Sequence, residues 1–188
     1  NFIIFIDEGG NMSDLCMFEV EDALDIPLTT KGCLDTKNSE LQEFIKRHKD
    51  VLGNSGVYIY AIPKKRARKV NGSQPLIPLY VGKTIRSFTE EAFAPAKIAL
   101  VSNYLVNNTV PELKLFLVKY PTRKGTNSQK HVDDLETYLV KSAKQINPDL
   151  LNTQKAKLDK WGIRGVLREY DKRKTSKSAK AFIDLFSF

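Results

Sequence analysis

Runs of β-forming residues predict three strands in the middle of the chain. Gly56–Ile62 combines alternation with Val, Ile and Tyr, and Leu76–Val81 and Leu113–Val118 have the same character. The polar segment Pro63–Pro75 joins the first two runs and contains an Asn71-Gly72 turn signal. We therefore expect the first two strands to pair as an antiparallel hairpin with a long loop.

Apolar residues at helical spacing predict two helices, around 88–106 and 128–146. Ser87 and Glu90 form a capping-box pattern before the first helix, and Pro95 must lie in its first turn or break it. The second helix has an apolar stripe made by Val132, Leu135, Leu139, Ala143 and Ile146. The order of elements predicts a mixed α/β (α+β) fold, a small and mainly antiparallel three-stranded sheet flanked by helices.

The 188 residues are divided by pattern and charge into a central domain and two extensions. Residues 1–55 hold 5 basic and 11 acidic side chains, and we expect a short strand at Leu15–Val20 and a helix capped by Ser39. Residues 56–152 hold 15 basic and 7 acidic side chains, and residues 153–188 hold 10 and 4. The prediction is an acidic N-terminal extension, a basic central domain and a basic C-terminal extension.

The composition narrows the class of protein. No apolar run approaches the roughly 18 residues of a membrane span, so we expect no membrane association. Cys16 and Cys33 are too few for a disulfide framework or a zinc site, which favours a reduced, intracellular, cytoplasmic protein. The net charge of +8, concentrated after residue 55, favours a polyanionic partner, most simply nucleic acid.

Phosphodiester hydrolysis requires residues of a kind that this chain places in its central domain. A carboxylate such as Glu136 can hold one divalent metal ion, because Mg²⁺ prefers oxygen ligands. A phenol beside a cation has a lowered pKa and can accept a proton, and Tyr58 and Tyr80 lie on adjacent predicted strands. Lys83 and Arg86 follow the second strand and can place positive charge near a phosphate.

The same residues form an ordered set of short motifs. The first strand starts with Gly56-Val57-Tyr58, the second ends with Tyr80-Val81-Gly82, a later helix carries Glu136, and Asn152 follows 16 residues after it. Over about residues 56–152 the chain resembles the GIY-YIG endonuclease superfamily, which is named for two such strand motifs.

The resemblance implies a metal-dependent DNA endonuclease that uses one Mg²⁺ or Mn²⁺ per site and no small-molecule cofactor. It implies that Tyr58 is the general base, that Tyr80 lines the site and that Glu136 binds the metal. Lys83 matches a lysine that some relatives carry after the second motif, and Asn152 would support the site through hydrogen bonds. We expect these residues to converge on one surface.

The chain departs from the family pattern at one position. Relatives usually have an arginine about ten residues after the tyrosine of the second motif, and this chain has Glu90 there, followed by Glu91. Either Arg86 takes the role of that arginine, or the site is weakened. A catalytically weakened nucleic-acid-binding module is therefore the alternative function, and a domain that binds an acidic protein is a third.

Two basic segments are expected to contact duplex or structured DNA through its phosphates. The residues concerned are Lys64, Lys65, Arg66, Arg68 and Lys69 in the hairpin loop, and Arg164, Arg168, Lys172, Arg173 and Lys174 in the C-terminal extension. The site residues also have structural alternatives. The tyrosines can be ordinary strand aromatics, Glu136 a solvated helix residue and Asn152 a turn residue.

Overall fold

The computed structural model describes residues 16–65, 67, 74–121, 128–152, 161–163, 166 and 175–186. The strands are β1 (Cys16–Val20), β2 (Leu24–Asp25), β3 (Gly56–Pro63), β4 (Leu76–Thr84), β5 (Lys114–Lys119) and β6 (Trp161–Ile163). The helices are α1 (Ser39–Arg47), α2 (Lys49–Leu52), α3 (Phe88–Ala92), α4 (Pro95–Asn108), α5 (Ser128–Ile146) and α6 (Lys177–Phe186). None of these helices is both long and apolar enough to cross a bilayer.

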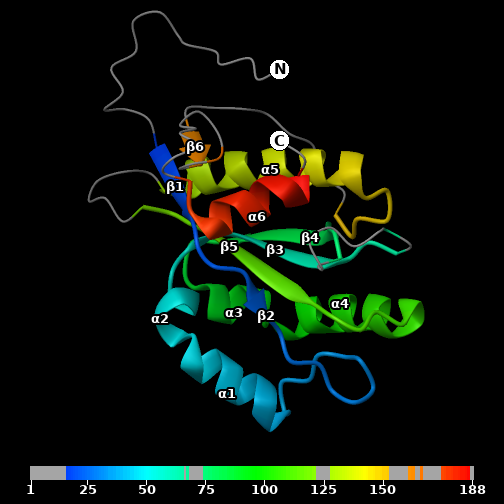
Figure 1. Ribbon diagram of the computed structural model, residues 1–188. Coiled ribbons are helices and arrows are strands. Elements are labelled where there is room, and N and C mark those ends of the chain that lie inside the picture. Colours follow the sequence, from blue (N-terminus) through cyan, green and yellow to red (C-terminus); the bar gives the residue numbers. More distant parts are fainter. Residues whose placement is uncertain are drawn as a thin grey trace, which may run out of the picture.

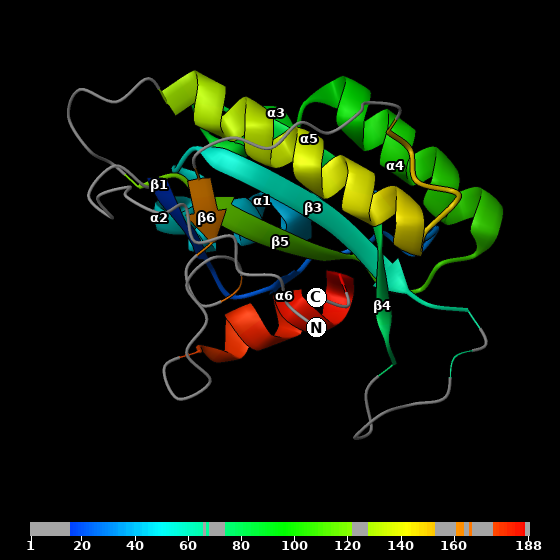
Figure 2. The same ribbon diagram turned by 90° about the horizontal axis from the view of Figure 1, so that it is seen from above.

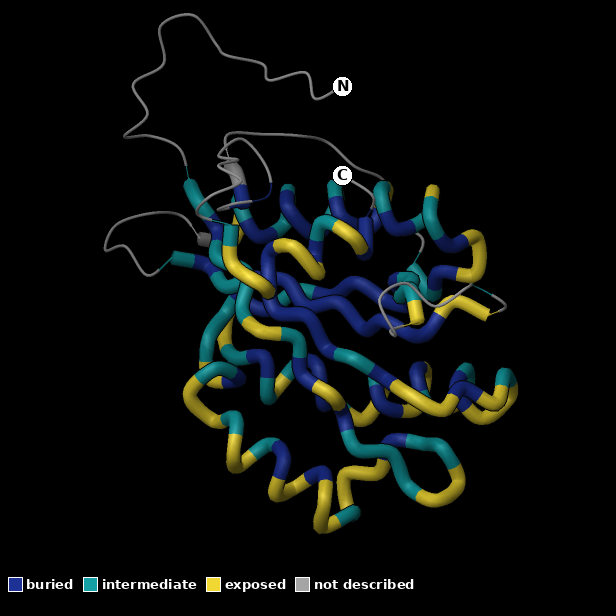
Figure 3. The backbone as a smooth tube through the Cα atoms, in the orientation of Figure 1, coloured by how far each residue is buried: buried dark blue, intermediate teal, exposed yellow. Residues whose placement is uncertain are grey.

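One sheet separates two layers of helices, with α5 and α6 on one face and α1 to α4 on the other (Figure 1). The side chains of β3 alternate between the two faces, as the pleat of a strand requires. Val57 and Ile59 pack with α5 and α6, whereas Tyr58 and Tyr60 pack with the opposite layer. Because both faces are covered, β3 is buried along its whole length (Figure 3).

The mixed α/β class is confirmed, but the sheet is wider than the predicted three strands. The predicted strands pair as antiparallel neighbours in the order β4-β3-β5. The sheet continues through β1 and β6, and β2 also pairs with β5, so strands from before residue 56 and after residue 152 join it. The pairing of β1 with β6 is parallel and the other pairings are antiparallel. Each of these short strands pairs with β5 or with another added strand, a long-range contact that a local pattern does not encode.

Two helix starts differ from the prediction. The expected helix at 88–106 is divided into α3 and α4, because Pro95 lacks the N–H that a continuous helix needs and instead occupies the first turn of α4. The cap of α1 is the Asn38 side chain, which accepts a hydrogen bond from the Glu40 N–H, and Ser39 is already helical. The Ser87 cap of α3 is confirmed by its contact with the Glu90 N–H.

Helix α5 fixes the geometry of the candidate site. Its apolar stripe, which includes Val132, Leu135 and Leu139, is fully buried against the sheet. Seen from above, α5 runs along β3, and α6 lies on the other side of β3 and β5 in this view while covering the same face of the sheet (Figure 2). Polar residues of α5 that lie next to this stripe are therefore held against the end of β4.

Candidate active site

Tyr58 and Tyr80 lie on the paired strands β3 and β4, as the sequence predicts. Their ring centroids are 6.1 Å apart, with an interplanar angle of 38°. Tyr58 is directly opposite Gly82, and a Cβ atom at Gly82 would lie 2.3 Å from Cζ of Tyr58. The glycine of the second motif therefore leaves the space that the Tyr58 ring fills.

Gly56, the glycine of the first motif, also has a structural reason. Its φ is 145°, and a Cβ there would lie 2.1 Å from the Val118 carbonyl oxygen of β5. Only glycine avoids this contact while adopting that backbone conformation. Close contacts in the sheet therefore require glycine at both positions, Gly56 against β5 and Gly82 against the Tyr58 ring.

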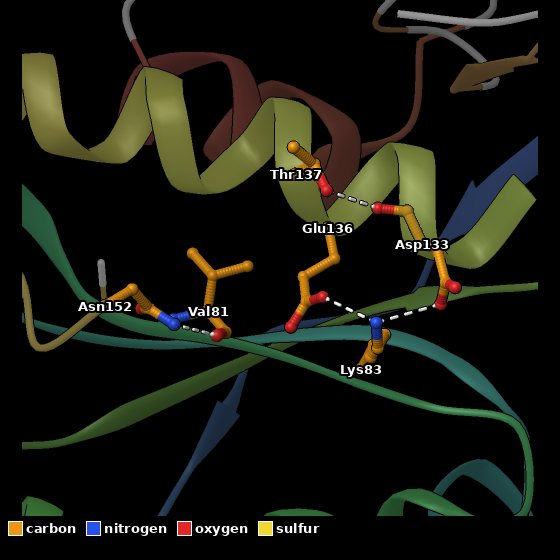
Figure 4. A network of polar contacts seen from close by, with 6 residues as sticks. All are labelled: Val81, Lys83, Asp133, Glu136, Thr137 and Asn152. Atoms are coloured by element: carbon orange, nitrogen blue, oxygen red, sulfur yellow. Dashed lines mark hydrogen bonds and ion pairs between the residues drawn. The ribbon is translucent and has the colours of Figure 1, made fainter. Parts of the chain in front are cut away.

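The polar centre of the site joins β4 to α5 (Figure 4). The Lys83 ammonium lies 3.1 Å from Oε2 of Glu136 and 2.9 Å from Oδ1 of Asp133. Glu136 is only 5% exposed, so it is not the solvated helix residue of the alternative interpretation. The three charged groups form one network at the end of β4, on the face of the sheet that α5 covers. Tyr58 and Tyr80 point to the opposite face, so the residues expected on one surface are divided between the two faces beside the edge strand β4.

Asp133 was not among the residues expected at this site. It precedes Glu136 by three residues, a spacing that places two side chains on the same face of a helix. Its backbone carbonyl also accepts a 2.7 Å hydrogen bond from the Thr137 hydroxyl. The i, i+3 spacing relative to Glu136 was the signal in the sequence that could have identified it.

The charge network shifts two pKa values. Burial raises the pKa of the Glu136 carboxyl, the nearby Asp133 adds to this, and Lys83 and Lys97 oppose it. Burial alone would lower the pKa of Lys83, but the carboxylates of Asp133 and Glu136 outweigh burial and raise it. Lys83 is therefore a stable cation, held by two carboxylates.

The pKa of Tyr58 shifts in the direction opposite to the expectation. We expected a neighbouring cation to lower the pKa of the phenol. Burial instead raises this pKa strongly, and Tyr80, Tyr60, Glu91 and Glu136 raise it further. The Tyr58 hydroxyl lies 3.5 Å from the Glu91 carbonyl oxygen, to which only a protonated phenol can donate. Burial and this contact both favour the neutral phenol of Tyr58.

Asn152 supports the site through the backbone of the edge strand. Its amide nitrogen donates to the Val81 carbonyl at 2.7 Å, and its amide oxygen accepts from the Val81 N–H at 2.8 Å (Figure 4). Leu151 N–H donates to the Leu79 carbonyl, and the buried Asn147 amide donates to the Pro78 carbonyl. The segment after α5 is thus hydrogen-bonded to the outer edge of β4, immediately before Gly82 and Lys83.

The cations near the site are arranged differently from the expectation. Arg86 is exposed, and its guanidinium lies 3.9 Å from Glu90, which is also exposed. Lys97 of α4 was not expected here, yet its ammonium lies 4.9 Å from the centroid of the Tyr80 ring. A single lysine in the otherwise uncharged segment 95–108 was the signal in the sequence that could have indicated it.

The residues expected to contact DNA are described only in part. Lys64 and Lys65 are exposed at the end of β3, and Lys65 approaches the Asn108 side chain at 3.5 Å. The others lie outside the described residues: Arg66, Arg68, Lys69, Arg164, Arg168, Lys172, Arg173 and Lys174.

Glu136 fits the requirements of a single divalent cation. Mg²⁺ is usually held by one or two carboxylates and completes its shell with water and phosphate oxygens. One Glu136 oxygen contacts Lys83, and the other points away from Lys83 (Figure 4). Across the described part of the chain, no cluster of three or more His, Cys, Asp or Glu side chains forms a larger metal site.

Comparison of the chain with models of protein families, with curated proteins and with solved structures found no match. The function of the chain is therefore inferred from the geometry of its own residues.

Proposed function

We propose that the chain is a metal-dependent DNA endonuclease with its active site at the end of β4. The observation that carries the proposal is the buried carboxylate of Glu136, held 3.1 Å from the Lys83 ammonium beside the hairpin that bears Tyr58 and Tyr80. On an ordinary surface helix a glutamate is exposed to water, because burial of a carboxylate is costly unless the charge is paired. A catalytic role for the Glu136 carboxylate would explain why the fold accepts the cost of burying it.

The residues divide the work of phosphodiester hydrolysis between them. Glu136 would hold one Mg²⁺ or Mn²⁺, which when bound polarises the phosphate and lowers the pKa of water. Lys83 restrains the Glu136 carboxylate, and Asn152 fixes the strand that carries Lys83. Tyr80 lies next to Tyr58 on the opposite face of the hairpin, and we propose that it lines the site from that side of the edge strand.

Tyr58 has a more limited role than general base in the state described. Its side chain is fully buried, and its hydroxyl lies 3.5 Å from the Glu91 carbonyl oxygen, so it contacts the protein interior in this state. Removal of its proton requires a cation closer than those of the described residues, since burial and neighbouring negative groups raise its pKa. We therefore propose that Tyr58 packs the hairpin in the state described, and that it acts as a base only when a cation adjoins it.

The substrate and compartment follow from charge and cysteine content. We propose duplex or structured DNA, bound through phosphates, because the residues after position 55 carry a large excess of positive charge. Cys16 and Cys33, which the structure describes, do not form a disulfide, in keeping with a reduced cytoplasmic environment.

A cleavage assay with several DNA forms tests this proposal. Supercoiled plasmid, linear duplex and branched DNA are incubated with the protein in Mg²⁺, in Mn²⁺ or in EDTA. We expect cleavage of at least one form with a divalent metal and none in EDTA. Intact DNA in all metal conditions would reject the nuclease function.

One observation favours a second function, a DNA-binding module without catalysis. The Lys83 charge is balanced by two carboxylates, and Arg86 lies beside Glu90, so neither is a cation free of acidic neighbours. Under this alternative the protein binds DNA in the same assay conditions but leaves it intact.

A further inference from the structure

Two carboxylates of helix α5 converge on one cation at the end of β4 (Figure 4). Oδ1 of Asp133 lies 2.9 Å from the Lys83 ammonium nitrogen, and Oε2 of Glu136 lies 3.1 Å from it. The two acidic residues are three positions apart, so the helix presents both side chains on the same face. The ammonium therefore marks a point at which two negative groups hold one positive charge.

These two carboxylate oxygens depend on the ammonium alone. Both atoms are buried, and among the described residues no hydrogen-bond donor other than Lys83 reaches either of them. Glu136 is only 5% exposed, and a buried carboxylate requires a counter-charge, because burial of an unpaired charge is costly. Any cation that compensates both oxygens has to lie between Asp133 and Glu136.

The cation at this point can be exchanged. The side chains of Lys83 and Asp133 are 37% and 40% exposed, so the contact is open to water on one side. A lysine carries a point charge on a flexible stem, and its ammonium can move outward without a change in the backbone of the strand. One ammonium also does not neutralise two carboxylates, and this excess of negative charge favours a divalent ion.

We propose that Asp133 and Glu136 together form the site for a divalent metal ion, and that the ion binds by replacing the Lys83 ammonium. The inference rests on the proposed function for the kind of ion, Mg²⁺ or Mn²⁺, and it adds Asp133 as a second carboxylate. Mg²⁺ is usually held by one or two carboxylates and keeps several water ligands, so two groups are sufficient. The ammonium and the ion exclude each other because like charges in one small site repel. Lys83 therefore lowers the affinity of the site for metal.

Calorimetric titration with Mn²⁺ tests this site without DNA and without cleavage. Wild type is compared with Lys83→Met, Asp133→Asn and Glu136→Gln. The controls are Lys37→Met and Asp50→Asn, which remove the same charges at exposed positions of the acidic segment. Loss of either carboxylate should weaken Mn²⁺ binding by roughly 10- to 100-fold, the usual effect of removing a group that supports a metal site.

The lysine variant should have the opposite effect. Lys83→Met should bind Mn²⁺ at least about 10-fold more tightly than wild type, since a single and a double positive charge about 6 Å apart repel by that much even in water. Both controls should bind as wild type does. Binding by Lys83→Met that is no tighter than wild type would overturn the exchange, and unchanged binding by Asp133→Asn would overturn the two-carboxylate site.

The reactivity of Lys83 in the wild-type protein gives an answer even if Lys83→Met does not fold. Reductive methylation is followed by mass spectrometry in EDTA and in Mn²⁺. An amine released from two carboxylates reacts faster, so Mn²⁺ should accelerate the methylation of Lys83 and leave that of Lys37 unchanged. Equal rates of Lys83 methylation in the two conditions would also overturn the exchange.

The metal site and the nuclease function fail in different ways. Protein that binds Mn²⁺ through Asp133 and Glu136 but leaves every form of DNA intact keeps the metal site and rejects the nuclease. Protein that cleaves DNA, while its Asp133→Asn variant binds Mn²⁺ with wild-type affinity, keeps the nuclease and rejects Asp133 as part of the metal site.

Discussion

The Lys83 ammonium lies 3.1 Å from the carboxylate of Glu136, and this contact joins the edge strand β4 to helix α5. Glu136 is buried, whereas the Lys83 side chain is 37% exposed, so the pair has one side toward water. The Glu136 carboxylate is therefore held in place by Lys83 and lies close to the solvent. The effects of this contact on stability and on cleavage can be measured separately.

Replacement of Glu136 by Gln should change the pH dependence of stability. Burial holds the folded-state pKa of Glu136 above its unfolded value. The stability that the protonated carboxyl contributes is therefore fully present below the unfolded pKa and is lost as pH rises through the folded pKa. Glutamine does not titrate, so the variant does not lose stability in this way. The free energy of unfolding of Glu136→Gln, relative to wild type, should therefore increase as pH rises from about 4.

Urea unfolding at a series of pH values measures this difference. Glu112→Gln, which changes an exposed glutamate, is the control and should follow the wild-type pH dependence. A difference between Glu136→Gln and wild type that falls with rising pH would contradict the direction of the pKa shift.

Gly82→Ala should destabilise the hairpin by about 1–3 kcal/mol, because overpacking a filled space forces neighbouring groups to move. The added Cβ would lie 2.3 Å from Cζ of Tyr58. Gly53→Ala is the matched control, since its Cβ would lie 3.1 Å from its nearest atom and its backbone is helical. Chemical denaturation should give a change below about 1 kcal/mol for the control. Equal effects of the two variants would refute the contact between Gly82 and Tyr58.

Asn152→Ala should weaken the attachment of the segment after α5 to β4. The variant leaves the N–H and carbonyl of Val81 without the two hydrogen bonds, at a cost of about 1–3 kcal/mol. Hydrogen exchange of the Val81 amide should accelerate accordingly. Asn103→Ala, at an exposed position of α4, should leave that exchange rate unchanged. Protection of Val81 that survives in Asn152→Ala would show that the amide pair is dispensable.

Arg86→Gln should have little effect on either stability or cleavage. Its ion pair with Glu90 is between exposed side chains, 82% and 61% exposed at 3.9 Å, and such pairs contribute at most about 1 kcal/mol. Thermal unfolding and cleavage should both stay close to wild type. A large loss of cleavage in a folded Arg86→Gln variant would instead support Arg86 as the substitute for the missing arginine.

Local sequence patterns predicted the strands and helices that carry the site. They did not predict the strand pairings that depend on long-range contacts. The alternation in Gly56–Ile62 and the stripe of 128–146 correctly indicated β3 and α5. The short segment Leu15–Val20 was correctly predicted as a strand, observed as Cys16–Val20, but its pairing with β5 and β6 depends on residues about 100 or more positions away.

In the candidate site, too, local patterns identified some residues and missed others whose contacts are long-range. The motifs brought Tyr58 and Tyr80 together through strand pairing, and Lys83 meets Glu136 as the packing of α5 on β4 requires. Asp133 and Lys97 were missed because their contacts depend on how α5 and α4 sit on the sheet. The expected lowering of the Tyr58 pKa was wrong, because burial raises this pKa and the depth of burial of a side chain cannot be read from the sequence.

Single-turnover cleavage of duplex DNA in Mn²⁺ by wild type, Glu136→Gln and Glu112→Gln tests the central claim most directly. If Glu136 holds the metal of a nuclease site, its isosteric replacement should slow cleavage by at least about 100-fold, while DNA binding in Ca²⁺ and the rate of Glu112→Gln stay near wild type. Cleavage by a folded Glu136→Gln variant at the wild-type rate would contradict the claim that this buried carboxylate is the centre of the active site.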